Sequence, residues 1–343
     1  MKKRRALGLG AWLFAALIFA GCQIKEPDNT PNLYKLRKLP VGSSARVDVS
    51  TGIGHNQVVH PDIVVYKKKF YLVVTPYPWC NDGYENPSIY VSEDGVHFRA
   101  AAKNPLVDPP KDGYNADPDL LVDRKLGIFR IYFVQTADSF GWHKLSMLQS
   151  HEAKKWYGPL ELLRMRPKKG GPFLVSPALV KRHGRYHLFA VDIDSNRTTH
   201  SVHLCTKDPY RHRLVHLVSK DGRRWDLQKA KSVEIDFPKW FNPWHINIVE
   251  GDGRYYMLVD GYKGGICDDH NLYLAVSEDL ECWHFIPQPV VTPDDGVIPH
   301  TKIIYRSAAL VDGEDMWIYF SAYTYSNFWY LGLKHIRIGD YVR

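Results

Sequence analysis

The stretch Val59-His60-Pro61-Asp62-Ile63-Val64-Val65-Tyr66 opens with polar residues and continues as a β-branched run; a short basic turn then leads to Phe70-Tyr71-Leu72-Val73-Val74. A polar opening, an apolar run, a tight turn and a second apolar run indicate a β-hairpin. The pattern recurs four more times, with the position of Asp62 matched by Asp119, Ala178, Asn247 and Ala309. The steps between these positions are 57, 59, 69 and 62 residues. Repeats of this length indicate repeated supersecondary units.

A second repeat, of the form Ser-x-acid-x-x-x-aromatic, runs in phase with the hairpins. It occupies Ser92–Phe98, Ser150–Trp156, Ser219–Trp225 and Ser277–Trp283. The serine and the acid can hydrogen-bond a tight turn, and the aromatic residue can anchor the strand that leaves it. Two hairpins per unit make a four-stranded sheet, and five such sheets arranged radially make a β-propeller. We therefore predict an all-β, five-bladed β-propeller over residues 56–343, with blade boundaries near residues 110, 170, 240 and 300.

Residues 1–21 have the composition of an export signal. A basic segment, Lys2–Arg5, precedes the apolar segment Ala6–Ala20, and Phe19-Ala20-Gly21-Cys22 resembles the lipobox of bacterial lipoproteins. We expect cleavage and lipidation at Cys22, which would anchor an exported protein to the membrane, in the periplasm or at the cell surface. The alternative is an ordinary secretory signal with a chance cysteine. Residues 22–55 are polar and are expected to form a tether.

The charge argues against a nucleic-acid partner. The chain carries +8, and removing the four basic residues of the export signal leaves +4. This mild excess is compatible with an anionic glycan, but no basic stripe with interleaved aromatic residues is present. We predict a single propeller domain that is a monomer.

Four cysteines remain after Cys22. Cys80, Cys205, Cys267 and Cys282 allow three pairings in an exported chain, and no Cys-x-x-Cys spacing indicates a zinc or redox site. One disulfide, such as Cys267 with Cys282, and a set of free thiols both remain open.

Polar residues open the first strand of each blade. These strands line the axis of a propeller, and their apolar runs are covered by the neighbouring blades. Their polar openings are therefore expected around the mouth of one central funnel: His60, Asp62, Asp117, Asp119, Ser176, His245, Asn247, Arg306 and Ser307. Buried carboxylates are rare unless they are paired or functional. Three of them from two adjacent blades favour a functional site over simple salt bridges with the histidines or the arginine.

A five-bladed propeller with acid-Pro openings and Ser-x-Asp-Gly-x-x-Trp turns resembles the family-43 and related furanosidase-type glycoside hydrolases. The resemblance covers about residues 56–340 and implies glycosidic-bond hydrolysis. It also implies an Asp before Pro in the first blade as general base, a second such Asp that tunes the acid, and a Glu from a later blade as general acid. In this chain His60 takes the first-blade position, with the acid moved to Asp62, and Asp117 precedes a proline in the second blade. Ser176 and His245 stand in the third and fourth blades, so the catalytic triad is displaced.

Glu85 supplies a further carboxylate, at the opening of the third strand of the first blade. It follows a loop that contains Trp79 and Tyr84, whose rings can stack on a sugar if the loop overhangs the funnel. Glycoside hydrolysis needs one protonated and one ionised carboxyl. Asp62 or Asp119 in the funnel and Glu85 near its wall can supply this division. A loop-capping carboxylate is the alternative for Glu85.

We predict a glycoside hydrolase that acts on a polysaccharide or oligosaccharide. The candidate catalytic acids are Asp62, Asp119, Asp117 and Glu85. The candidate substrate contacts are His60, Trp79, Tyr84, Ser176, Trp244, His245, Asn247 and Arg306. No cofactor is required; the resemblance leaves open one structural Ca²⁺ in the channel with His300 as a ligand, and no tight histidine spacing indicates zinc. The rival hypothesis, favoured by the displaced triad, is a catalytically inactive carbohydrate-binding lipoprotein.

Overall fold

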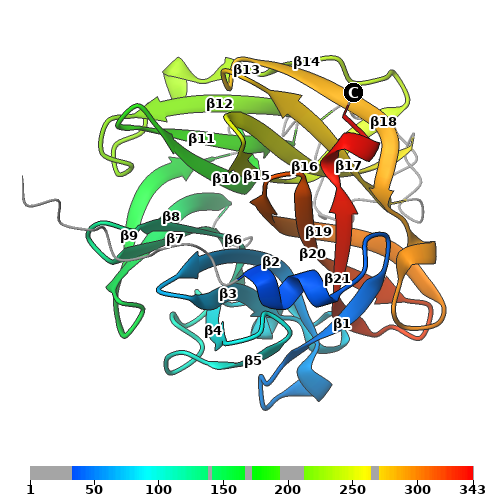
Figure 1. The fold of residues 1–343 in the computed structure, drawn as a ribbon. Coiled ribbons are helices and arrows are strands. Elements are labelled where there is room, and N and C mark those ends of the chain that lie inside the picture. The colour runs from blue at the N-terminus through cyan, green and yellow to red at the C-terminus, as the bar shows by residue number, and fades with distance from the viewer. Residues whose placement is uncertain (1–32, 138–140, 167–171, 194–211, 264–269, 343) are drawn as a thin grey trace, which may run out of the picture.

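Five antiparallel β-meanders surround a central axis in the computed structural model (Figure 1). The structure describes residues 33–137, 141–166, 172–193, 212–263 and 270–342, and within these ranges the regular elements are strands and short 3-10 helices. The all-β propeller prediction is confirmed.

In the first four blades the four main strands follow one another in the chain, with the first strand innermost. The first blade contains β2 (Val58–Tyr66), β3 (Lys69–Pro76), β4 (Ser88–Ser92) and β5 (His97–Ala100). The second contains β6 (Gly113–Asp123), β7 (Ile128–Ala137), β8 (Trp142–His151) and β9 (Lys155–Met165). The third contains β10 (Leu174–Arg182), β11 (Arg185–Asp192), β12 (Arg213–Ser219) and β13 (Lys231–Ser232). The fourth contains β15 (Phe241–Gly251), β16 (Arg254–Lys263), β17 (His270–Ser277) and β18 (Cys282–Val291), with β14 (Glu234–Ile235) on its outer edge. The fifth contains β19 (Thr301–Asp312), β20 (Asp315–Thr324) and β21 (Trp329–Arg337). The breaks between blades enclose the four predicted boundaries.

The fifth blade takes its fourth strand from the N-terminal part of the chain. Strand β1 (Ser44–Val49) pairs antiparallel with β21 and also forms a short parallel pairing with β5. Before it, the 3-10 helix η1 (Leu33–Lys38) buries Leu33 and Leu36 in the core between blades five and one. The expected tether over residues 22–55 is therefore wrong for residues 33–49, which close the propeller. The first and fifth blades form one continuous sheet through β1.

A chain that starts at residue 51 should lose most of its stability. It lacks the buried side chains of Leu33, Leu36, Val47 and Val49, each of which contributes roughly 1.5–3 kcal/mol on burial. Their sum is comparable with the about 5–15 kcal/mol that stabilises a whole domain. Urea unfolding should show this loss, whereas a control chain that starts at residue 31 should unfold at the full-length midpoint. Equal midpoints for both chains would contradict the closing role of β1.

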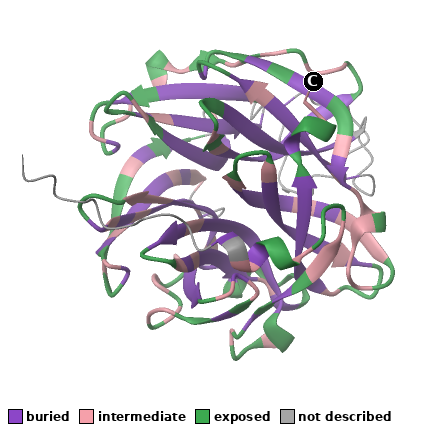
Figure 2. Cartoon of the chain, viewed as in Figure 1, coloured by how far each residue is buried: buried purple, intermediate pink, exposed green. Residues whose placement is uncertain are grey.

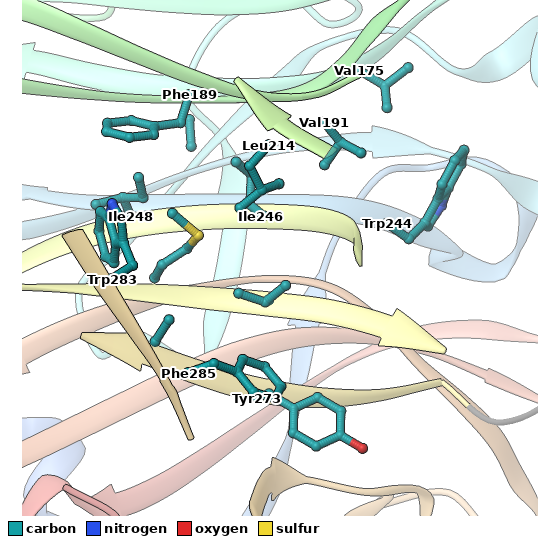
Figure 3. Close-up of a cluster of buried hydrophobic side chains, with 14 of the residues drawn as sticks. Val175, Phe189, Val191, Leu214, Trp244, Ile246, Ile248, Tyr273, Trp283 and Phe285 are labelled. Carbon is teal, nitrogen blue, oxygen red and sulfur yellow. The ribbon is translucent and has the colours of Figure 1, made fainter. Parts of the chain in front are cut away.

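Apolar residues fill the spaces between neighbouring blades. Between blades three and four, Phe189 and Val191 of β11 pack against Ile246 and Ile248 of β15 in one cluster with Trp283 (Figure 3). Buried residues concentrate on the strands, and exposed residues lie mostly on the connecting loops (Figure 2). The alternating patterns that predicted the strands also form the interfaces that hold the blades together.

The predicted Ser-x-acid turns form in three of the four places. Ser92 Oγ accepts from the backbone N–H of Gly95 (2.9 Å), and Asp94 Oδ1 accepts from those of Val96 and His97 (both 2.9 Å). The same bonds recur at Ser219–Asp221 and Ser277–Asp279. The turn after Ser150 differs. There Glu152 accepts hydrogen bonds from Tyr66 and Lys67 of the first blade, so it joins two blades instead of closing its own turn.

Acid should destabilise the third blade through His216. Its ring stacks on Phe189 at 4.2 Å and lies 3.0 Å from a ring nitrogen of His187. Burial lowers the pKa of His216 to about 4, with further lowering by His187 and Lys231. Between about pH 6.5 and pH 4, His216 is protonated in the unfolded chain but stays neutral in the folded chain. The free energy of unfolding should therefore fall by about 1–3 kcal/mol as the pH is lowered through this range. The urea midpoint should differ less between pH 7 and pH 4.5 in the His216→Phe variant than in the wild type. An equal difference in the two proteins would show that His216 does not cause the loss of stability in acid.

Cys80 and Cys282 carry free thiols. The disulfide between Cys267 and Cys282 is therefore not formed. Cys205 and Cys267 lie outside the described residues.

The predicted export signal and Cys22 also lie outside the described residues, so lipidation stays a prediction. In the part of the chain that the structure describes, no helix has the length and apolarity needed to cross a membrane.

Candidate metal centre in the propeller mouth

Each inner strand has a bulge near its beginning, where its ladder with the second strand slips by one residue. In the first three blades the bulge contains a residue before proline with a left-handed backbone: His60 (φ 55°), Asp117 (φ 53°) and Ser176 (φ 51°). This conformation is strained for residues other than glycine, and such strain gathers at functional sites. A bulge also re-aims the side chains around it. The sequence therefore places His60 and Asp117 at the mouth through local backbone geometry.

Asp62 and Asp119 tie neighbouring blades together. Asp62 Oδ2 accepts from the backbone N–H of Leu120 in the second blade, and Asp119 Oδ2 accepts from that of Leu179 in the third. Asp62 Oδ1 also accepts from Asn247 Nδ2 of the fourth blade, at 3.2 Å. Buried N–H groups outside a ladder need an acceptor. These two carboxylates therefore take part in the packing of neighbouring blades.

His60, Asp117 and His245 come together from three different blades. Asp117 Oδ1 lies 3.4 Å from His60 Nε2 and 3.5 Å from His245 Nδ1. The ligand atoms of the three residues all lie within 4.8 Å of one another, and all three side chains are buried. This is the one group of this kind among the described residues.

Glu85 stands behind His60. Its Oε1 lies 3.1 Å from His60 Nδ1, and Thr75 Oγ1 lies 2.9 Å from the same nitrogen. A proton on Nδ1 that is shared with Glu85 leaves the lone pair of Nε2 directed at the Asp117 side. Carboxylates in this relation to a histidine commonly orient it as a metal ligand.

Arg306 fills the floor of the mouth and is fully buried. Its guanidinium donates to Ser176 Oγ (3.1 Å), to the carbonyl of Pro118 (3.2 Å) and to that of Pro177 (3.0 Å). It also lies 3.6 Å from Asp117 Oδ1. The arginine therefore joins the second, third and fifth blades and offsets the charge of Asp117.

The surroundings of the cluster lower the pKa values of both Asp117 and His245. Burial opposes the charge of Asp117, but His245, His60 and Arg306 together lower its pKa to about 2. Burial lowers the pKa of His245 well below its usual value, and Asp117 only partly opposes this. An ionised carboxylate and a neutral imidazole are the forms that bind a metal ion.

The other carboxyls have raised pKa values. Burial raises the pKa of Asp62 to about 6 against the hydrogen bond from Leu120 and the charge of Arg306. Burial and then the charge of Asp62 raise that of Asp119, and burial raises that of Glu85 against its contact with His60. Repulsion from Asp62 therefore contributes to the raised pKa of Asp119, but burial is the larger cause.

Unpartnered polar atoms show that the cluster fits a divalent cation. Asp117 Oδ1 and both ring nitrogens of His245 are buried without a hydrogen-bond partner. Buried polar atoms are rarely left in this state. Two imidazoles and one carboxylate are a common donor set for Zn²⁺ and related transition metals, with a further position left for water or substrate. His60 Nε2, Asp117 Oδ1 and His245 would hold such an ion.

The remaining predicted site residues lie in three settings. Trp79 and Tyr84 are exposed in the loop between β3 and β4. This loop lies on the face of the propeller at which the inner strands begin. Trp244 is buried and donates to the hydroxyl of Tyr305 at 2.9 Å. His300 is exposed in the turn before β19, and its role as a channel calcium ligand stays a prediction.

Tyr305 is a site residue that the sequence did not reveal. Its ring lies 4.3 Å from that of His245 and 5.6 Å from that of His60. The bulge of β19 lies between Ile304 and Ser307, which gives Tyr305 the place that His60 has in β2. The match of Ala309 with Asp62 was thus two residues out of register.

A second buried Asp–His pair adjoins the cluster in the fourth blade. Asp260 lies opposite His245 in the ladder of β15 and β16, and its Oδ1 lies 3.1 Å from His270 Nδ1. The alternation of inward and outward side chains along β16 and β17 is enough to predict that Asp260 and His270 lie on the same face of the sheet. No local sequence pattern indicates that these two side chains contact each other.

Known proteins share this fold. No protein-family model matches the chain. A crystal structure of a thermostable family-43 glycoside hydrolase superposes with a TM-score of 0.60 at 14% identity, covering 86% of this chain and 92% of that one. The fold is that of the family-43 propellers. At this level of identity the likeness concerns the family-43-type fold alone.

Two further matches concern deacetylases of amino sugars. The "A type blood N-acetyl-alpha-D-galactosamine deacetylase" of Flavonifractor plautii is 34% identical over 95 residues, which are 25% of this chain and 12% of that protein. A crystal structure of an N-acetylgalactosamine deacetylase from F. plautii, in complex with blood group B trisaccharide, has a TM-score of 0.69 to this family-43-type propeller at 17% identity. That superposition covers 86% of this chain and 95% of the other. The match to the curated deacetylase spans only about an eighth of its length.

Proposed function

We propose that this chain is a metal-dependent hydrolase that removes the N-acetyl group of an amino sugar within a saccharide. The observation that carries the proposal is the buried His60–Asp117–His245 cluster with its unpartnered oxygen and nitrogens. A divalent ion held there would polarise the amide carbonyl and lower the pKa of a bound water. The similarity to the deacetylases of F. plautii supports this choice of bond.

The residues of the chain divide the remaining tasks. Glu85 orients His60 through Nδ1, which directs His60 Nε2 toward Asp117. Arg306 and Ser176 hold Asp117 in place, since Ser176 donates its backbone N–H to Asp117 Oδ2 at 2.8 Å. The ring of Tyr305 contacts both histidine rings and helps to fix their orientation.

Glycoside hydrolysis is the second candidate. Asp117 is ionised and Glu85 has a raised pKa, and they lie at opposite nitrogens of the His60 ring. This is the division of roles that two catalytic carboxyls need. In this version Asp117 and Glu85 act without a metal, whereas Asp62 and Asp119 keep their amide partners.

One substrate separates the two candidates, because the two reactions break different bonds. p-Nitrophenyl N-acetyl-α-galactosaminide yields acetate on deacetylation and nitrophenol on glycoside hydrolysis. We expect acetate from the full-length protein supplied with Zn²⁺, Mn²⁺ or Co²⁺, and its loss after EDTA treatment. Nitrophenol release that resists EDTA would favour the glycosidase; binding of saccharides without either product would favour the inactive lectin-like alternative.

We also propose that the protein works at a membrane surface through lipid on Cys22. The basic, apolar, small-residue, Cys order of residues 2–22 supports this. Cys22→Ser should move the protein from the membrane fraction to the soluble fraction or leave it unprocessed, and unchanged fractionation and processing would overturn the proposal.

A further inference from the structure

Exposed aromatic side chains gather at one face of the propeller. Among the described residues, the aromatic side chains with the largest exposure are Tyr325 (68%), Trp79 and Tyr157 (61% each), Tyr84 (44%) and Trp240 (37%). All except Tyr157 lie in connections at the face where the inner strands begin and the second strands end. That face carries the mouth with the His60–Asp117–His245 cluster. Exposed apolar groups concentrated on one face indicate a binding surface.

The backbone around Trp79 is strained in a way that holds its ring in solvent. Trp79 and Cys80 are left-handed (φ 54° and 58°), and so are His55 and Asn56 (φ 55° and 61°) in the segment beside them. Such conformations cost about 1–3 kcal/mol each for non-glycine residues and persist where they serve a function. The ring of His55 meets that of Trp79 edge to face, with ring centroids 6.0 Å apart.

We call the exposed rings of Trp79 and Tyr325 the rim; the loop between β3 and β4 carries Trp79 and also reaches the His60–Asp117–His245 cluster. It begins at the end of β3 and reaches Glu85, which contacts His60 in the cluster. Cys80 Sγ accepts from Trp329 Nε1 at 3.2 Å and lies 3.6 Å from the hydroxyl of Tyr323, so the loop is bound to both strands that flank the Tyr325 turn. Trp79 and Tyr325 therefore stand on two loops that are joined to each other beside the site.

We propose that Trp79 and Tyr325 bind a second sugar unit, so that the preferred substrate is an oligosaccharide and not a single N-acetylated sugar. The proposal rests on the proposed function only in placing the acetylated unit at the cluster. Aromatic rings offer a large, rigid apolar face at low entropic cost, which suits the C–H face of a sugar ring. The loop that carries Trp79 continues to Glu85 beside the cluster, so a saccharide with its acetylated unit at the cluster and its next unit toward this loop would meet Trp79 and Tyr325.

The test compares one short and one long substrate. Methyl N-acetyl-α-galactosaminide offers only the acetylated unit, and a trisaccharide with a terminal N-acetyl-α-galactosamine adds two further units. Trp79→Ala and Tyr325→Ala should each lower kcat/KM for the trisaccharide about tenfold, mainly through KM. Both should leave kcat/KM for the methyl glycoside within about twofold, and Trp79→Phe should restore most of the loss. Tyr157→Ala, which removes an equally exposed ring on the outer strand β9, should change neither.

The outcomes separate this proposal from the proposed function. If the wild-type protein deacetylates neither substrate, calorimetric binding of the same trisaccharide to wild type and Trp79→Ala still decides the role of the rim. Equal kcat/KM or equal affinity for wild type and both variants would overturn the proposal. An equal loss on both substrates would also overturn it, because the loop would then act on the pocket through Glu85.

Discussion

Asp117→Asn should abolish both metal binding and turnover. The substitution removes the one ionised oxygen shared by His60, His245 and Arg306. An amide is a poor metal ligand here, and the loss of several kcal/mol of transition-state stabilisation corresponds to roughly a 10³-fold fall in kcat. Metal content of the purified variant and acetate release from the aryl glycoside measure the two effects. The asparagine carbonyl can still accept from the N–H of Ser176, so the variant should fold.

Asp119→Asn is the matched comparison. Asp119 follows Asp117 by two residues and is equally buried, but its Oδ2 accepts from Leu179 and its raised pKa favours the neutral form. Asparagine keeps that acceptor, so metal content and kcat should change by less than about fivefold. A hundredfold loss in Asp119→Asn or Asp62→Asn with an active Asp117→Asn would instead place the chemistry at the Asp62–Asp119 pair.

Arg306→Met should be the most destabilising single substitution in the mouth. It leaves Asp117 as a buried charge without its guanidinium, and it removes the donors to Ser176 and to the carbonyls of Pro118 and Pro177. Removing one partner of a buried charged group costs about 3–5 kcal/mol. Urea unfolding should show a lower midpoint with an unchanged slope.

Two companion variants identify the cause of that loss. Arg306→Lys keeps the charge but loses the planar fork, so it should lie between wild type and Arg306→Met. The double variant Asp117→Asn with Arg306→Met should be more stable than the sum of the single effects, because the uncompensated charge is gone. If Arg306→Met lowers the free energy of unfolding by less than about 1 kcal/mol, the contact between Arg306 and Asp117 contributes little to stability. The same conclusion follows if the effects of the two single substitutions add exactly in the double variant.

The sequence was sufficient for the propeller because its signal is local and repeated. Alternating apolar residues form the strands, and the Ser-x-acid turns recur in phase with them; the predicted blade boundaries fall in the observed breaks. The bulge residues before proline could also be found, since His60, Asp117 and Ser176 share one local pattern. The predicted turn does not form after Ser150, because the carboxylate of Glu152 accepts a hydrogen bond from Lys67 of the first blade and not from the backbone of its own turn.

The closure of the ring was missed for a different reason. Val47 and Val49 alternate with polar residues as a strand should, but β1 is short and its partner β21 lies at the other end of the chain. The error at Tyr305 has a related cause. A shift of two residues keeps every side chain on the same face of a strand, so alternation cannot detect it.

The sequence by itself determined the fold class, the blade limits and most of the polar residues at the mouth, but not Tyr305. The tertiary structure decided which of them meet: Asp62 and Asp119 accept amides of the next blade, whereas Glu85, His60, Asp117 and His245 form one cluster. The physical reason is that contacts across the axis join blades that are far apart in the chain. Local patterns specify each strand and the face on which a side chain lies, but the rotation and bulge of every blade decide which side chains come within bonding distance.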